Sequence, residues 1–402
     1  MISGFDYSKY LKQKKIFGIV KLNNTRIIGQ ERGLYFYLFN FKSYLFNKLE
    51  KNYGDKEIGF LKAILLGESS SLDENIKENF KNANISHVLA ISGMHISYVV
   101  IGLETVLKKI IKNIKLRNLI VIVFLMFFTI LVGGSNSVSR ACIMVSIAYI
   151  GKIVLRKEDF YTSFKIALCI LLIVSPYNIF SGSLWLSFGG SIGIVLYSKL
   201  IEKIILKKLK LKKYNKNCLN EKVLRRIVTI ISVTLGAQII VFPIMIYIFN
   251  SLSINFVISN LLISELVAPI LILGYLSLVF PFISIFEKIL IKIIFFFAEI
   301  SANLPLTNIL VVTPRLYKII IYYIILLFIG FIYSTRKIHM FRKIKKLKLT
   351  IVFISLIILF VLFGNIKIPL RENFEIHFLD VGQGDSCLIR TTTNKVILID
   401  RR

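Results

Sequence analysis

The fold is decided by a stretch that runs from His87 to Leu107 and reads HVLAISGMHISYVVIGLETVL. It is roughly 20 residues long, which is enough for a helix to cross the hydrocarbon core of a bilayer. Two histidines, two serines and a glycine interrupt its apolar residues between His87 and Ser97. Because an ionisable group near the bilayer centre costs about 2.5 kcal/mol or more on insertion scales, polar groups at this depth indicate a functional site.

The remainder of the chain repeats this apolar pattern. Its 402 residues are 55% hydrophobic with a mean hydropathy of +0.72, and apolar runs of about 17 residues or more alternate with short charged loops. Soluble domains rarely reach such values, so the sequence predicts an all-α polytopic membrane protein. We expect about ten transmembrane helices, at 87–107, 118–132, 138–155, 162–175, 184–200, 227–249, 255–280, 285–302, 317–334 and 349–365.

Lysine and arginine set the expected orientation of these helices. The formal net charge is +30, and cytoplasmic loops of membrane proteins carry such a basic excess. We therefore expect the basic loops in the cytoplasm and both termini, residues 1–85 and 366–402, outside it. Contact of the same loops with a nucleic acid is an alternative that charge alone leaves open. Basic residues gather at 108–117, 152–165, 199–226 and 336–348, whereas the alternate loops at 133–138, 175–183 and 250–255 carry none.

Both ends of the chain differ from this membrane domain. From Glu375 the sequence reads EIHFLDVGQGDSCLIRTTTNKVILID, in which β-branched residues alternate around a Gly- and Asp-rich turn, a pattern that predicts a β-hairpin. The N-terminus starts MISGFDYSKYLKQKK and has no apolar signal-peptide region, although its expected place is outside the cytoplasm. We therefore expect that a segment upstream of it is missing.

The two histidines of the first span are eight positions apart, which on one helix separates them by about 12 Å along the axis. They can share a metal only if the helix breaks, and Ser92 with Gly93 favours a break at that point. Ser92 and His95 are neighbours at i, i+3, so an intramembrane hydrolase that uses this pair is one alternative, although no orienting acid is visible nearby. Small residues in this segment also suit close packing between helices.

Four polar residues on other spans complete the candidate site. Together with His87 and its neighbours they favour an aqueous path through the helices over a lipid-facing position. Pairing of Glu265 with Arg140 for a purely structural purpose is an equal alternative. Polar residues and Pro269 also favour a break or kink in the span at 255–280. The four residues are Arg140, Gln238, Asn260 and Glu265.

The stretch HVLAISGMHIS resembles the signature of ComEC-type competence proteins, the inner channel for DNA uptake in naturally transformable bacteria. Other stretches resemble the same family in order along nearly the whole chain. They are FDYSKYLKQKKIFG (Phe5–Gly18), SNSVSRACIM (Ser135–Met144), LWLSFGGSIGIVL (Leu184–Leu196), LGAQIIVFPIMIYIFNSLSINFVISNLL (Leu235–Leu262) and FLDVGQGDSCLI (Phe378–Ile389).

The resemblance implies three domains, and the sequence departs from the family pattern at two places. Residues 1–52 would be a remnant of an extracytoplasmic OB-like domain, 53–365 the channel domain, and 366–402 the start of a metallo-β-lactamase-like domain, so short β-rich fragments are expected at both ends. Asn136 stands where the family commonly has proline. The metal-ligating HxHxDH run of the family is absent downstream, so we predict no metal, no cofactor, no catalytic residue and no enzyme activity. We expect a chain truncated at both ends, as a fragment or disrupted gene product would be.

The resemblance also implies a multi-pass protein of the bacterial plasma membrane that imports single-stranded DNA. His87, Ser92, His95 and Arg140 would line or shape the path. Besides DNA and the lipid bilayer, the implied partners are a DNA-receptor protein outside and an ATP-driven DNA translocase in the cytoplasm, since the chain has no GxxxxGK[ST] motif. A secondary transporter for a small solute is the other alternative, and inverted repeats would favour it. The oligomeric state does not follow from the sequence.

The alternation of basic and neutral loops predicts which segments a label reaches. Cysteine labelling or reporter fusions should place Lys207 to Lys213 in the cytoplasm and Gly384 outside it, because basic loops stay on the cytoplasmic side. Labelling of the 207–213 loop from outside intact cells would overturn this orientation and the inward direction of transport.

Overall fold

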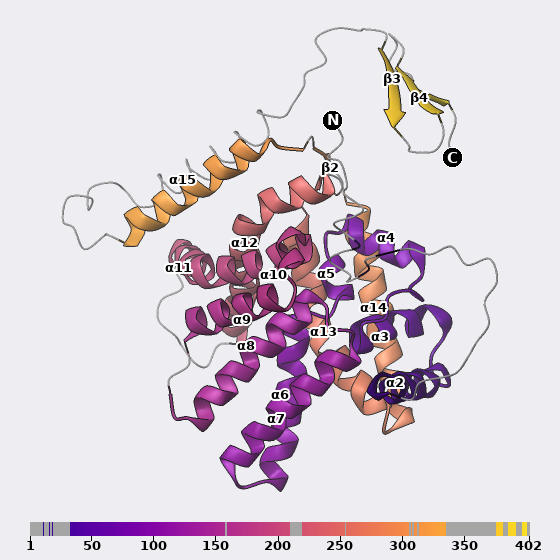
Figure 1. Cartoon of the computed structure of the whole chain (residues 1–402), viewed down its shortest axis with the longest axis vertical. Coiled ribbons are helices and arrows are strands. Elements are labelled where there is room, and N and C mark those ends of the chain that lie inside the picture. Colours follow the sequence, from indigo (N-terminus) through magenta and orange to yellow (C-terminus); the bar gives the residue numbers. More distant parts are fainter. Residues whose placement is uncertain are drawn as a thin grey trace. The chain divides into compact units, whose positions relative to one another are not determined.

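The computed structural model describes residues 11, 16, 18, 33–156, 159–209, 219–253, 255–304, 307, 309–311, 313–334, 375–380, 385–390 and 396–399. The chain divides into two units, Met1–Thr313 and Pro314–Arg402. Figure 1 shows their elements, and each unit is described by itself.

Helices build the first unit, and they follow the apolar runs of the sequence. A π-helical turn, η2, joins α10 to α11, and the two-residue strands β1 and β2 pair antiparallel, with Ser251 opposite Leu310. The elements in order are α2 (Leu34–Glu50), α3 (Asp55–Leu66), α4 (Glu74–Asn82), α5 (Ser86–Leu89), α6 (Gly93–Ile110), α7 (Ile114–Leu131), α8 (Asn136–Ile153), α9 (Phe160–Val174), η1 (Pro176–Phe180), α10 (Gly182–Gly193), η2 (Ile194–Ser198), α11 (Lys199–Lys208), α12 (Leu219–Phe249), β1 (Ser251–Leu252), α13 (Phe256–Ser277), η3 (Pro281–Ile283), α14 (Ser284–Ala302) and β2 (Ile309–Leu310).

Four helical segments in the described part of the chain are long and apolar enough to cross a membrane. They are Ile114–Leu131, Gly182–Lys208, Glu221–Phe249 and Phe256–Ser277. The other expected spans between 118 and 334 also coincide with helices, but these are shorter, less apolar or more charged. The protein is therefore mostly helical, as predicted, and the expected span at 349–365 lies outside the described residues.

The first expected span, 87–107, is two helices and not one. Helix α5 ends at Leu89, and α6 begins at Gly93 after Ala90 and Ser92 adopt extended backbone conformations. Ser92 is the N-cap of α6, and its N–H donates to Nδ1 of His95 at 3.3 Å. Serine competes for backbone hydrogen bonds and therefore favours such a cap over a helix interior, so the break that Ser92 and Gly93 indicated is confirmed.

The break expected at 255–280 is wrong, because α13 is one continuous helix from Phe256 to Ser277 that contains Pro269, and a kink there stays a prediction. Asn260 keeps its amide within the helix, donating from Nδ2 to the carbonyl oxygen of Phe256 at 2.9 Å. An internal proline removes one backbone donor, whereas a full break would expose several polar groups to an apolar environment. The helix therefore continues.

The β-rich fragment expected over 1–52 is wrong for its last part, because residues Leu34–Glu50 form helix α2. Leu45, Phe46 and Leu49 fall at helical spacing and pack against the largest apolar core of the first unit, which favours a helix over a strand. Most of residues 1–32 lie outside the described residues, so the assignment of 1–52 to an OB-like domain stays a prediction.

The largest core of the first unit lies between α3, α4, α5, α13 and α14. Phe60 and Phe80 are almost fully buried in it, with ring centroids 5.9 Å apart. Glu287 of α14 is also fully buried, and the hydroxyl of Tyr53 donates a hydrogen bond to it. A buried carboxyl group is costly without such a donor, so this bond ties the α2–α3 connection to α14.

Glycines hold α10 close to α12. A Cβ atom added at Gly193 would lie 2.4 Å from the carbonyl oxygen of Gly236, and one added at Gly236 would lie 3.0 Å from the backbone nitrogen of Ser198. Small residues allow this close approach of two helices where apolar side chains give little net drive for association. The contact fixes α10, which carries part of the site described below.

The second unit contains α15 (Leu316–Ser334) and a three-stranded antiparallel sheet. The strands are β3 (Glu375–Asp380), β4 (Asp385–Arg390) and β5 (Val396–Ile399), with Glu375 opposite Arg390 and Cys387 opposite Ile399. The predicted β-hairpin is present as β3 and β4, and β5 adds a third strand.

Candidate functional site

The break between α5 and α6 fixes the ring of His95. This side chain is only 1% exposed, and its Nδ1 accepts from the Ser92 N–H and lies 2.9 Å from Ser92 Oγ. A backbone N–H can only donate, so Nδ1 is the acceptor and the proton of the neutral ring is assigned to Nε2. Nε2 lies near the backbone of Val88 but makes no hydrogen bond of normal geometry with any described residue.

His87 extends the polar group from α5 toward α13. The residue is exposed, and its side chain lies near that of Asn260 and near that of His95. The two histidines thus belong to different helices that the break brings near each other. Among the described residues, no group of three or more His, Cys, Asp or Glu side chains could hold a metal ion.

Arg140 of α8 carries the charge of the site. Its Nη1 donates to Ser191 Oγ of α10 at 2.9 Å, and its guanidinium lies 5.7 Å from the ring centroid of Phe188. A Cβ atom added at Gly93 would lie 3.3 Å from Nη2, so the guanidinium also reaches the first residue of α6. The absence of a side chain at Gly93 leaves room for the arginine.

A polar seam between α8 and α10 holds Arg140 in register. The other two contacts of this seam are Asn136 Nδ2 to Ser181 Oγ at 3.1 Å and Ser137 Oγ to Ser187 Oγ at 3.3 Å. Asn136, where the resembling family commonly has proline, therefore contributes an interhelical hydrogen bond here. Such bonds are worth on the order of 1 kcal/mol each between membrane helices, so the seam orients α8 on α10.

Two predicted residues have other partners. Glu265 accepts from Arg226 Nη2 at 2.8 Å, so the alternative in which Glu265 pairs with Arg140 is wrong. Gln238 directs Nε2 to the sulfur of Met245 at 3.7 Å within its own helix α12. The structure thus brings Arg140 close to Gly93 and Asn260 close to His87, whereas no contact among the described residues brings Gln238 or Glu265 to this group.

Sequence reasoning missed the partners on α10. Ser187 and Ser191 are four positions apart on one face of an otherwise apolar helix, a spacing that could have indicated a polar contact across helices. Phe188 carries no such signal, because an aromatic residue in an apolar helix most often faces lipid or core. Arg226 was counted with the basic loop at 199–226, although it lies inside helix α12.

The Ser92–His95 pair has no acid beside it among the described residues. No described carboxylate hydrogen-bonds His95, whereas a nucleophile and base are normally accompanied by a third group that orients the base. The pair is explained by the cap of α6, where both groups serve the first turn.

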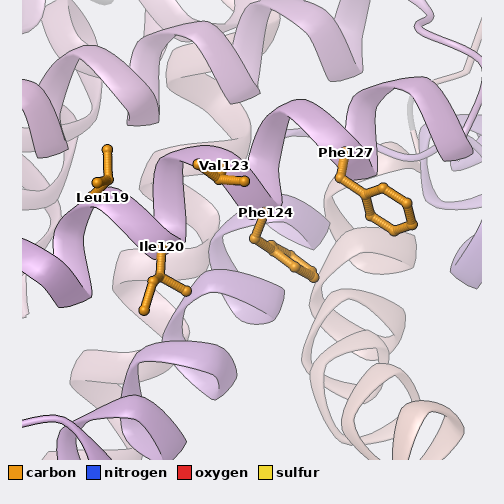
Figure 2. A pocket seen from close by; sticks show the side chains of 5 residues that line it. All are labelled: Leu119, Ile120, Val123, Phe124 and Phe127. Atoms are coloured by element: carbon orange, nitrogen blue, oxygen red, sulfur yellow. The ribbon is translucent and has the colours of Figure 1, made fainter.

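A contrasting surface lies on α7. Figure 2 shows five apolar side chains of that helix around a shallow hollow of about 440 Å³. Val123 on this face is 58% exposed, and no polar side chain lines the hollow. An apolar face of this kind on a helix long enough to span a bilayer suits contact with lipid chains. The lining residues are Leu119, Ile120, Val123, Phe124 and Phe127.

Comparison with known proteins gives one family and one relative. The model of a family described as Competence protein matches residues 64–337. The chain is 22% identical over 200 residues to ComE operon protein 3 of Bacillus subtilis (strain 168), a match that covers 50% of this chain and 26% of that protein. The chain thus corresponds to about a quarter of that relative's length. No solved structure matches significantly.

The close contact at Gly93 predicts a position-specific loss of stability. Gly93→Val should lower the melting temperature of the purified protein in detergent, because the added Cβ presses on Arg140 Nη2 and approaches Ala141 Cβ at 3.7 Å; overpacking of this kind costs about 1–3 kcal/mol. Gly102→Val on the same helix is the control, since nothing lies within 4 Å of its added Cβ. Equal losses at both positions would contradict the packing described here.

Proposed function

The chain belongs to the competence protein family, and from this premise we propose that it forms a transmembrane channel for the import of single-stranded DNA during natural transformation. The proposal is supported by the family match, by the apolar helices and by the polar site that they enclose. Since the chain covers only part of its relative, its substrate, its partners and its activity are all part of the proposal.

The observation that carries the proposal is a polar chain across five helices of an apolar bundle. It comprises Asn260 on α13 near His87 on α5, His95 on α6 near His87, and Arg140 on α8 bound to Ser191 on α10, with Arg140 Nη2 close to Gly93 of α6. A polyanion crosses a membrane only along a wetted path that offers positive charge and hydrogen-bond donors. His87 as a residue is exposed and Arg140 is half-buried.

The proposed topology has about ten transmembrane helices, with the basic loops in the cytoplasm and both termini of the chain outside the plasma membrane. In that orientation α6 leads inward from the site toward the basic residues at 108–117. An inward path that ends among basic loops suits a strand of negative charge. The domain boundaries after residues 52 and 365 stay predictions.

The proposed partners follow from what the channel lacks. A path alone does no work, so we assign the driving force to an ATP-driven translocase in the cytoplasm and the delivery of DNA to a receptor outside. The segment 366–402 is proposed to have no nuclease activity of its own. Three short strands bury little apolar surface, and a sheet this small is marginally stable without further packing.

Two substitutions in the polar chain test the channel. In the complete protein in its host, His95→Ala and Arg140→Ala should each reduce uptake of labelled DNA while membrane insertion stays intact, because each removes a polar group from the path. Thr105→Ala on α6 is the control, since its hydroxyl bonds only the Ile101 carbonyl of its own helix. Normal uptake in both variants would leave helix packing as the better explanation of these residues.

A further inference from the structure

Arg140 stands in the bundle without a carboxylate partner. Helices α8 and α10, which hold its guanidinium, contain neither aspartate nor glutamate. The one acid of α6, Glu104, pairs with Lys108 at 3.2 Å. Within the described part of the chain, Arg140 takes part in no ion pair, and its buried Nε has no hydrogen-bond partner. An arginine in an apolar bundle normally pairs with an acid or a carbonyl group, and an unpaired one marks a ligand or ion pathway.

The guanidinium is fixed and partly open at the same time. Ser191 accepts from Nη1, and its own hydroxyl donates to the backbone carbonyl of Ser187 or Phe188 at 3.0 Å, so the acceptor is oriented. The residue as a whole remains half-buried, as do Ser92 and Gly93 beside it. Of the five N–H donors of a guanidinium, those on Nη1 reach Ser191 Oγ and Met144 Sδ, that on Nε is buried, and those on Nη2 have no hydrogen-bond partner among the described residues.

The neighbouring backbone adds positive potential. Nη2 lies against Gly93, the first residue of the 18-residue helix α6. The first N–H groups of a helix have no acceptor within the helix and carry the positive end of its dipole. A guanidinium beside such an end is unfavourable on its own. An oxyanion between the two removes this repulsion and accepts hydrogen bonds from both.

Resting on the proposed function, we infer that Arg140 binds one backbone phosphate of the single-stranded DNA, with the first turn of α6 as the second donor. The phosphodiester group has the charge and the paired oxygens that a guanidinium binds in a bidentate way. Such a contact reads no base, so the channel accepts any sequence at this point. Gly93 serves the same contact, because a side chain there would displace Nη2.

Binding measured against salt tests the assignment. The purified full chain in nanodiscs of zwitterionic lipid is titrated with a fluorescent single-stranded oligonucleotide at several KCl concentrations. Arg140→Gln should reduce the slope of log K against log salt by about 0.7, the value of one released counterion on a single strand. Arg140→Lys should keep the slope and weaken binding, because lysine keeps the positive charge but cannot bind the phosphate with two parallel N–H donors as a guanidinium does. Arg226→Gln is the control, since Arg226 already pairs with Glu265.

A second arm keeps the test independent of folding effects. An oligonucleotide with uncharged methylphosphonate linkages should bind the parent protein and the Arg140→Gln variant equally well, because no phosphate charge is left to contact. Gly93→Ala, whose Cβ would lie 3.3 Å from Nη2, should weaken binding of the natural strand only. An unchanged salt slope in Arg140→Gln, or an equal loss of binding for both kinds of strand, would overturn the phosphate contact.

The outcome separates this inference from the proposed function. A normal salt slope in Arg140→Gln, together with DNA uptake that depends on the chain, would remove the phosphate contact and leave the channel. A reduced slope in a protein that imports no DNA would keep the contact and remove the channel.

Discussion

The structure depends on how an apolar helical bundle satisfies its few polar side chains. Away from water, an unpaired polar group costs free energy comparable to a lost hydrogen bond or more. Here the break between α5 and α6 supplies the first partner, since Ser92 and His95 bind each other where the helix begins. His87 then meets Asn260, and Arg140 meets Ser191. These contacts lie on five helices, and they leave the guanidinium of Arg140 only partly satisfied.

The glycines of the bundle have two different roles. Close approach of backbones explains Gly193 and Gly236 fully, because each faces backbone atoms of the other helix. Gly93 is different, since the atom that a side chain would meet is the Nη2 of Arg140. Close helix packing thus explains the glycines between α10 and α12. It does not explain why Arg140 has no acidic partner among the described residues. The charge is the feature that a purely structural account leaves unexplained.

The helices and the local break were predictable from the sequence, whereas the side-chain pairing was not. Apolar runs of bilayer length give the helices between 118 and 334, and a serine followed by a glycine indicated the cap at Ser92. The partner of Glu265 depends on how α12 and α13 are rotated and crossed, which hydropathy does not encode. Helix α2 was missed because its aromatic residues suit a strand as well as a helix, and contact with the core decides between them.

The most direct test of the central claim, that the polar chain lines the route of DNA, is site-specific photo-crosslinking during uptake. A photoreactive residue is placed at Ala90, which is exposed at the break, or at Val123 on the apolar face of α7 shown in Figure 2. In cells that carry the complete protein and import labelled DNA, the account predicts crosslinks to the strand from position 90 and none from position 123. Crosslinks from position 123 alone, or from neither position while uptake continues, would contradict it.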